Sequence, residues 1–168
     1  MYLIIDIETR PNNALREAFQ QGSAGQQVAL LKEEEERVCL TNKVMSTDQD
    51  YSEIICIGLH QVGGQTRITE SLKDLATPAW ANIFEQLTIV SFNGKKFDLP
   101  ILIKQGLKMG LDFPYKRLMA ACKPWGYGER HIDLMETLAF GGKWKALHEY
   151  LQIYLGEKKL TKGSEFFD

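Results

Sequence analysis

The start of the chain places the strongest constraint on the fold. Residues 2–7 form an apolar run with little alternation between polar and apolar side chains. Such a run is typical of a central strand that is covered on both faces of a sheet. Asp6 and Glu8 stand at its end. Because side chains two apart in a strand point to the same side, we expect Asp6 and Glu8 to project together, with Ile5 and Ile7 on the other side.

The rest of the chain contains further strand-like and helix-like segments. Strands are expected at residues 53–61, 65–69 and 88–92, the first two joined as a hairpin. Residues 131–135 are expected to be a strand end that runs into a helix. Helices are expected at residues 74–87, 101–106 and 144–155. Residues 15–37 predict two helical pieces or a mobile flap, since glycines interrupt them. This order predicts an α/β fold with a mixed central sheet and flanking helices.

Composition restricts the class of protein. The 168 residues, 44% of them hydrophobic, suit a single domain over residues 1–168. A net charge of −2 argues against a protein that coats duplex DNA, but not against one that cleaves a strand end. Three widely spaced cysteines predict reduced thiols and a cytoplasmic location. We expect neither a signal peptide nor a membrane span.

Three acidic side chains are candidates for a metal site. Repulsion between Asp6 and Glu8 in a buried strand would be relieved by a hard, oxygen-ligated cation such as Mg²⁺ or Mn²⁺. Asp98 follows a predicted strand and an Asn93-Gly94 turn, a position where α/β sheets commonly hold ligand-binding groups. The alternatives are surface acids at a frayed strand end and, for Asp98, the capping of a helix that has proline at its first position.

Three segments carry a resemblance to a known family. IIDIETR, SFNGKKFDLPIL and HIDLMETL resemble the DEDD superfamily of 3′→5′ exonucleases, which has a ribonuclease H-like fold. The similarity is greatest to the predicted exonucleases related to the proofreading domain of family B DNA polymerases. The motif residues that match are Asp6, Glu8 and Thr9 in the first motif, Asn93, Phe97 and Asp98 in the second, and His131 and Asp133 in the third segment.

The resemblance implies an activity and a set of site residues. Asp6, Glu8 and Asp98 would be catalytic and would bind Mg²⁺ or Mn²⁺, two ions in a complete site, while Thr9, Asn93 and Phe97 would bind substrate. The substrate would be the 3′ end of single-stranded DNA or RNA, with DNA favoured. Asp133 is a further candidate metal ligand, although in relatives an aspartate here more often caps a helix or supports the site.

One motif of the family is not matched. The resemblance implies a Tyr-x-x-x-Asp or His-x-x-x-x-Asp motif after the leucine-rich helix, but no such motif follows Leu155. The simplest account is C-terminal truncation by one helix, so that the missing helix or a partner chain supplies the fourth carboxylate. The alternatives are an inactive nuclease-like module that binds nucleic acid or protein, and a phosphohydrolase of small phosphoesters.

Aromatic and basic residues are further candidates for contacts with nucleic acid. Tyr115, Trp125, Tyr127 and Arg130 could form a surface on which unpaired bases stack, the alternative being an aromatic loop packed over the core. Lys95 and Lys96 are candidates for phosphate contacts, the alternative being a solvated turn.

Overall fold

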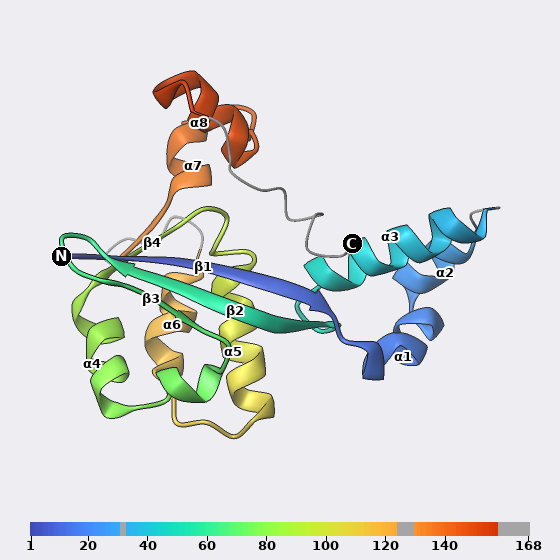
Figure 1. Cartoon of the computed structure of the whole chain (residues 1–168), viewed down its shortest axis with the longest axis horizontal. Coiled ribbons are helices and arrows are strands. Elements are labelled where there is room, and N and C mark those ends of the chain that lie inside the picture. Colours follow the sequence, from blue (N-terminus) through green and yellow to red (C-terminus); the bar gives the residue numbers. More distant parts are fainter. Residues whose placement is uncertain (31–32, 124–129, 158–168) are drawn as a thin grey trace.

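A computed structural model describes residues 1–30, 33–123 and 130–157, and within them one mixed sheet organises the chain. Its order is β3-β2-β1-β4-β5, with β1 (Tyr2–Pro11), β2 (Ser52–Gln61), β3 (Thr66–Thr69), β4 (Thr88–Ser91) and β5 (His131–Asp133). The β1-β2 and β2-β3 pairs are antiparallel, while β1-β4 and β4-β5 are parallel. The predicted α/β fold with a mixed central sheet is confirmed (Figure 1).

One face of the sheet carries the hydrophobic core. The elements α4 (Pro78–Gln86), α5 (Asp98–Lys108) and α6 (Tyr115–Ala121) and the 3-10 helix η2 (Leu72–Leu75) lie on this side, below the sheet in Figure 1. Alternate β1 side chains point into the core, where they join residues of the other strands and of these helices; the cluster includes Leu3, Ile5, Ile7, Ile57, Leu59, Phe84, Ile89, Leu99 and Leu102. Burial of these apolar side chains is the main stabilising term of the fold.

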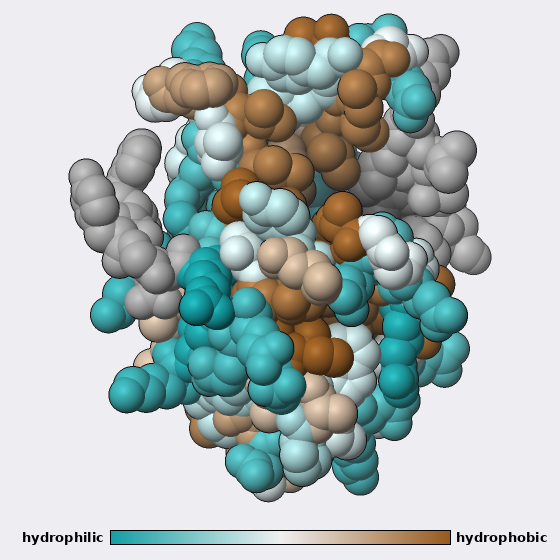
Figure 2. Space-filling view, turned by 90° about the vertical axis from the view of Figure 1, so that its left-hand side faces the viewer, coloured by the Kyte–Doolittle hydropathy of each residue, from teal (hydrophilic) through white to brown (hydrophobic). Residues whose placement is uncertain are grey.

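The opposite face of β1 is only partly covered, so the prediction that both faces are covered is wrong for the described residues. Tyr2 is 47% exposed and Ile4 39%, whereas their neighbour Leu3 is 1% exposed. Figure 2 shows hydrophobic residues at the surface in the upper half of the molecule, above the core layer. The strand therefore alternates between a core face and an open face, although its sequence is apolar throughout its first half.

Two more helices stand on the open side of the sheet. These are α7 (Leu134–Ala139), which follows β5 directly as expected, and α8 (Leu147–Leu155), above the sheet in Figure 1. Tyr150 of α8 is buried, and its ring meets Phe92 edge to face at 6.0 Å between centroids. In the described part of the chain, no helix is long and apolar enough to cross a membrane.

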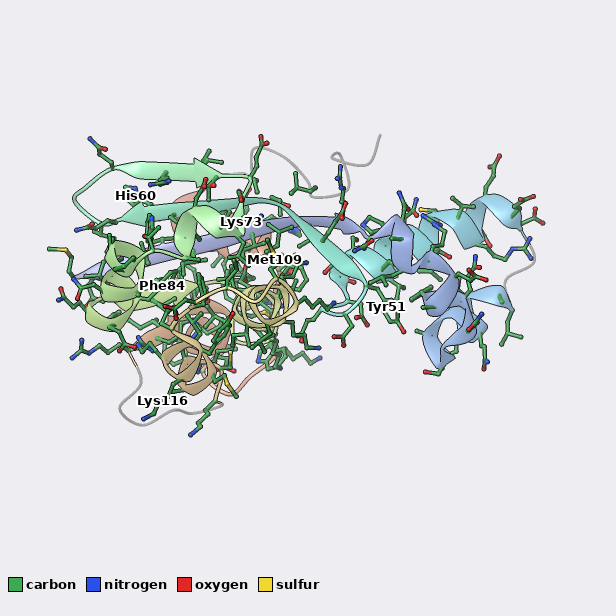
Figure 3. The ribbon with its side chains drawn as sticks, turned by 90° about the horizontal axis from the view of Figure 1, so that it is seen from below. Tyr51, His60, Lys73, Phe84, Met109 and Lys116 are labelled. Carbon is green, nitrogen blue, oxygen red and sulfur yellow. The ribbon has the colours of Figure 1, made fainter. Side chains whose placement is uncertain are left out.

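A helical arm extends beyond the end of β1. It comprises η1 (Asn13–Leu15), α1 (Arg16–Gln21), α2 (Ser23–Ala29) and α3 (Glu34–Thr47) (Figures 1 and 3). The break expected at Gly22 is present between α1 and α2, but a third helix runs ten residues beyond the predicted end at residue 37. Buried Phe19 packs edge to face on Tyr51, at 5.3 Å between ring centroids, and this contact joins the arm to the start of β2.

Several predicted boundaries were wrong for local reasons. The helix expected at residues 74–87 is divided into η2 and α4, because Thr77 is an N-cap whose hydroxyl accepts from the Trp80 amide and Pro78 starts α4. This matches the tendency of a residue before proline to leave the helical conformation. No helix was expected where α6 forms, and β1 continues to Pro11 through pairing with β2.

We expect Phe19→Ala to loosen the arm while the sheet stays folded, because Phe19 lies outside the core cluster beneath the sheet. Hydrogen exchange should show loss of protection in α1 and α2 but not in β1 or β2. The matched control is Phe84→Ala, in the core, which should cost about 3–5 kcal/mol of global stability. Equal loss of protection in the arm and the sheet after Phe19→Ala would contradict this view of the arm.

Candidate active site

The candidate site forms where β1 continues past the end of β4. Strand β4 pairs with Tyr2, Leu3 and Ile4 only, and it ends at Ser91. Farther along β1, the Ile7 amide donates to Oδ1 of Asp98 at 3.0 Å. Asp98 is the first residue of α5 and is 3% exposed. Its carboxylate therefore takes the place of a strand partner and ties the first turn of α5 to the sheet.

The alternative role for Asp98, the capping of α5, is not what the structure shows. Phe97 occupies the N-cap position, and no side chain there makes a capping hydrogen bond. Pro100 is the third residue of α5 rather than the first. Proline is tolerated there because the first amides of a helix have no intrahelical acceptor. The carboxylate of Asp98 points to β1 instead.

Electrostatics sets Asp98 apart from an ordinary surface acid. The pKa of Asp98 is raised from 3.8 to about 7, mainly by burial, then by the charge of Asp6 and, to a smaller extent, by that of Asp133. Hydrogen bonds from the amides of Asp98 and Ile7 act in the opposite direction. Asp6 and Asp98 are thus close enough for their charges to repel each other, although only Asp98 is buried.

Asp6 and Glu8 share the open face of β1, as the alternation along the strand predicts. Asp6 is exposed and Glu8 is half-buried, while Ile5 and Ile7 point into the core. Cys56 is the cross-strand partner of Glu8, and its thiol pKa is raised by burial, then by the charge of Glu8, then by that of Asp6. Both carboxylates therefore lie around one point of this face, next to a register shift after Glu8.

The turn at residues 93–97 delivers Asp98 to this position. Asn93 has a left-handed backbone, with φ of 65°, and its carbonyl accepts from the Lys96 and Phe97 amides. Glycine is required at position 94 because there is no room for a side chain, and not because of its φ angle. A Cβ atom there would lie 2.2 Å from Ser91 Oγ and 3.3 Å from Asp98 Oδ2. The Asn93-Gly94 pair thus allows the chain to reverse tightly against both β4 and α5.

Asp133 holds this turn in place. Its Oδ1 accepts from the Asn93 amide at 2.8 Å and from the Met135 amide at 3.1 Å, and its Oδ2 accepts from the Lys95 amide at 3.0 Å. It is 3% exposed and is the N-cap residue of α7. Both carboxylate oxygens thus already have backbone donors, so Asp133 has the capping and supporting role that the sequence allowed.

His131 is a packed residue. Its Nδ1 lies 2.8 Å from the Ala121 carbonyl oxygen and its Nε2 2.8 Å from Ser91 Oγ. A carbonyl oxygen only accepts, so Nδ1 carries the proton and Nε2 accepts from the serine hydroxyl. Burial lowers the pKa of His131, which favours this neutral form. The ring links β4, β5 and α6.

The three predicted substrate-binding residues fall into two groups. Asn93 and Phe97 are half-buried on the turn next to Asp98. Thr9 is buried on the other side of β1 from Asp6 and Glu8, and its hydroxyl donates to the Ser46 carbonyl at 2.6 Å. The structure therefore places Thr9 at the contact between β1 and α3.

Several contacts to the turn have no signal in the sequence. Lys95 Nζ forms an ion pair with Glu136 Oε2 at 2.8 Å, and both side chains are largely buried. Lys96 Nζ lies 3.4 Å from the centroid of the Trp144 ring. The side chain of Gln49 donates to the Lys96 carbonyl. Of these residues the sequence pointed only to the two lysines. Lys95 is largely buried in its ion pair, whereas Lys96 is exposed and contacts the Trp144 ring.

The stacking surface expected around residues 115–130 is not supported where the structure describes it. Tyr115 donates to the Leu111 carbonyl and packs on Phe113, and Arg130 donates to the carbonyls of Glu85 and Gln86. The other two candidates, Trp125 and Tyr127, lie outside the described residues.

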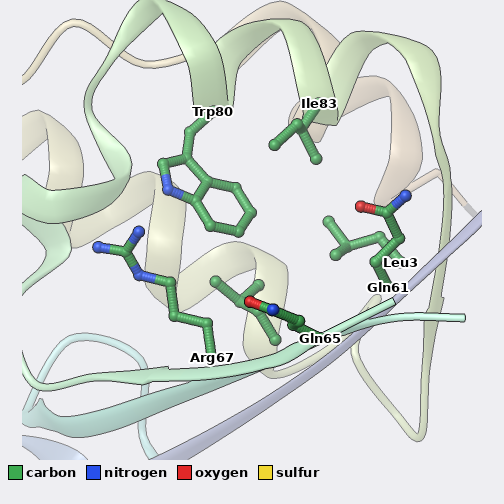
Figure 4. Close-up of a pocket in the computed structure, with 7 residues that line it drawn as sticks. Leu3, Gln61, Gln65, Arg67, Trp80 and Ile83 are labelled. Carbon is green, nitrogen blue, oxygen red and sulfur yellow. The ribbon is translucent and has the colours of Figure 1, made fainter. Parts of the chain in front are cut away.

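A pocket lies away from the carboxylates, between α4 and the β2-β3 hairpin (Figure 4). Arg67 stands over the Trp80 ring there, at 5.7 Å from its centroid. The pocket is lined by Leu3, Leu59, Gln61, Gln65, Arg67, Trp80 and Ile83. It contains none of the predicted site residues.

The donor set suits a hard cation. Within residues 1–30, 33–123 and 130–157, no three His, Cys, Asp or Glu side chains gather into a preformed metal cluster. Mg²⁺ in phosphate-processing sites usually keeps several waters and uses only one or two carboxylates together with substrate phosphates. Asp98, buried beside Asp6, offers carboxylate oxygens of this kind. A bound cation would offset the burial of the Asp98 charge, which is the main cause of its raised pKa, and the repulsion from Asp6, which is the second cause.

We expect Asp133→Ala to destabilise the protein by several kcal/mol, because it removes the acceptor of the Asn93, Lys95 and Met135 amides. Each buried amide left without a partner costs about 1–3 kcal/mol. Asp133→Asn keeps one acceptor oxygen and should be intermediate in denaturant unfolding. The control is Asp112→Ala, at an exposed position. Similar unfolding midpoints for Asp133→Ala and the control would rule out this role.

Comparison with known proteins agrees with this architecture. The structure is similar to that of the family B DNA polymerase from the hyperthermophilic archaeon Pyrobaculum calidifontis, with a TM-score of 0.57 and 15% identity. The similarity covers 99% of this chain but 20% of the polymerase, and at this identity it shows the fold alone. No curated protein sequence gives a match.

The family comparison is more specific. Residues 30–155 match the family described as a predicted 3′-5′ exonuclease related to the exonuclease domain of PolB. The match includes the 93–97 turn, Asp98 and Asp133, and it begins after Asp6 and Glu8. It covers three quarters of the chain. The chain therefore belongs to this family of predicted 3′→5′ exonucleases, as the sequence motifs had indicated.

Proposed function

We propose that the protein is a metal-dependent 3′→5′ exonuclease that hydrolyses phosphodiester bonds at the 3′ ends of single-stranded nucleic acid, with DNA favoured. The observation that carries the proposal is the buried carboxylate of Asp98, held against β1 beside Asp6 with its pKa raised to about 7. Such a strongly perturbed group in a protein of a nuclease family is a candidate for function.

Asp6, Glu8 and Asp98 would hold Mg²⁺ or Mn²⁺. When bound, such ions supply an activated water and neutralise charge on the phosphate. The protein holds its carboxylates in fixed positions. Ile7 fixes one oxygen of Asp98 through its amide, and Asp133 fixes the turn that precedes Asp98. Asn93 and Phe97, half-buried on that turn, would contact the terminal nucleotide.

A fourth carboxylate is part of this proposal. Asp133 is engaged by three backbone amides, which argues against its use as a ligand. The proposal therefore takes its fourth carboxylate from outside the described residues of this chain or from a partner chain. A chain that lacks this carboxylate would bind the second ion poorly and would be only weakly active. In that case the second candidate function, a nuclease-like module that binds without cutting, would apply.

Activity on end-labelled single strands tests the proposal. With Mn²⁺, wild-type protein should shorten a 5′-labelled strand progressively from its 3′ end, and chelator should abolish this. Asp6→Asn and Asp98→Asn should each reduce the rate at least about a hundredfold, since even residues that only orient metal ligands are worth about 10–100-fold. Asp112→Asn, at an exposed position, is the matched control. Release of the 5′ nucleotide first, or preference for a small phosphoester, would exclude the proposed activity.

Stability as a function of pH tests the Asp98 environment without reference to activity. The Asp98 pKa is raised on folding, so the folded state loses stability as the pH rises from about 4 to about 7, and the loss is complete above 7. In chelator, Asp98→Asn should therefore become more stable relative to wild type over this pH interval. The gain in the free energy of unfolding should reach a few kcal/mol, since each unit of pKa shift corresponds to about 1.4 kcal/mol.

Metal should reverse this difference. At pH 8, Mn²⁺ should raise the melting temperature of the wild-type protein and raise that of Asp98→Asn much less, because binding to the folded state stabilises it. Asp112→Asn should respond as wild type does. An Mn²⁺ effect of equal size in Asp98→Asn would show that Asp98 is not a ligand.

A further inference from the structure

An exposed basic and aromatic loop lies next to the candidate site. Residues 140–146, here called the aromatic loop, connect α7 to α8 and read Phe-Gly-Gly-Lys-Trp-Lys-Ala. Phe140 is 85% exposed and Trp144 50% exposed. Lys143 and Lys145, which flank the tryptophan, are also exposed. Aromatic rings between basic residues are the composition found where proteins hold single strands.

The loop is fixed at both ends. Helix α7 ends in two left-handed residues, Phe140 with φ of 47° and Gly141 with φ of 78°. Helix α8 begins where Glu149 Oε1 accepts from the Ala146 amide at 2.9 Å. Tyr150 then docks α8 on Phe92, the residue that follows β4. The aromatic loop therefore has a defined place relative to the end of β4.

The 93–97 turn contacts the loop directly. The Lys96 ammonium lies 3.4 Å from the centroid of the Trp144 ring, within the range of a cation–π interaction. The ion pair of Lys95 with Glu136 attaches α7 to the same turn. Asp98 follows this turn, so the indole ring and the buried carboxylate are held by the same short segment.

The loop carries positive charge that forms no ion pair with an acidic side chain among the described residues. Among the described residues, Lys143 and Lys145 form no ion pair, and Lys96 is exposed apart from its contact with Trp144. The two acids nearest in sequence are already engaged. Glu136 pairs with Lys95, and Glu149 accepts from the Ala146 amide. Charge complementarity therefore favours an anionic occupant that also offers a flat ring.

We propose that the aromatic loop and Lys96 bind single-stranded nucleic acid upstream of the 3′ terminus, with an unpaired base stacked on Trp144 and phosphates beside Lys143 and Lys145. The choice of substrate rests on the proposed nuclease function. A strand with free base faces fits this surface, whereas bases in a duplex are stacked on one another. The loop selects single strands, and the 93–97 turn connects it to the position of Asp98.

Equilibrium binding in chelator tests this proposal apart from catalysis. The full chain would be titrated into a fluorescent oligothymidine, and Kd read from fluorescence anisotropy. Trp144→Ala should raise Kd about 5- to 100-fold, the usual cost of removing one base–aromatic stack. Trp144→Phe should restore part of the affinity. Lys143→Ala and Lys145→Ala should each lower the slope of log K against log salt by about 0.7 for each phosphate that the lysine neutralises.

Control variants separate this surface from general electrostatics. Lys116→Ala removes the same charge from the exposed side of α6, among the helices under the sheet (Figure 3), and should leave both Kd and the salt slope unchanged. Melting temperatures of all variants should stay near that of the wild type, because the substituted side chains are exposed. A blunt duplex should bind weakly and should be insensitive to Trp144→Ala.

Each result is decisive. An unchanged Kd for Trp144→Ala, or an equal weakening of duplex and single-strand binding, overturns the proposal. So does a change in oligomeric state on gel filtration without a change in Kd, which would make the loop a contact between copies of the chain. Binding that depends on Trp144 in a protein without Mn²⁺-dependent cleavage would support the loop while rejecting the proposed exonuclease activity. Mn²⁺-dependent cleavage by a protein whose binding does not depend on Trp144 would support the proposed exonuclease activity and reject the role of the loop.

Discussion

The hydrogen bond between the Ile7 amide and the Asp98 carboxylate is the contact on which the rest of the site depends. Because β4 ends at Ser91 while β1 continues to Pro11, the second half of β1 has no partner strand on that side among the described residues. A buried amide without an acceptor costs about 1–3 kcal/mol. Asp98 supplies the acceptor, and the chain thereby places a carboxylate where the sheet alone would leave a gap.

Two buried aspartates near this point have opposite surroundings. Asp133 receives three backbone amides, so both of its carboxylate oxygens are committed to hydrogen bonds. Asp98 receives the Ile7 amide on one oxygen, lies beside the charge of Asp6, and has its pKa raised to about 7. Equal burial, 3% exposure for each, therefore leads to different consequences. Asp133 is suited to hold the 93–97 turn and the start of α7 in place. Asp98 is the carboxylate whose burial and repulsion a cation would offset.

The sequence was informative where the determining interactions are local. The period of two along β1 was enough to place Asp6 and Glu8 on one face, and Asn93-Gly94 was enough to place a tight turn before Asp98. The role of Asp133 was not determined in this way, because its partners Asn93 and Lys95 are about forty residues away and meet it only when β5 pairs with β4. The contact of Lys96 with Trp144 depends in the same way on how α7 and α8 are placed.

The 93–97 turn is where these long-range contacts converge. Asp133 and Glu136 hold it from β5 and α7, Gln49 holds it from the residues that follow α3, and Trp144 covers Lys96 from the aromatic loop. The turn has no helix or strand ladder of its own to stiffen it, so these contacts fix its position. Asp98 begins the helix that the turn introduces. The position of the Asp98 carboxylate is therefore set jointly by β5, α7, the aromatic loop and the residues after α3, and not by β1 and α5 alone.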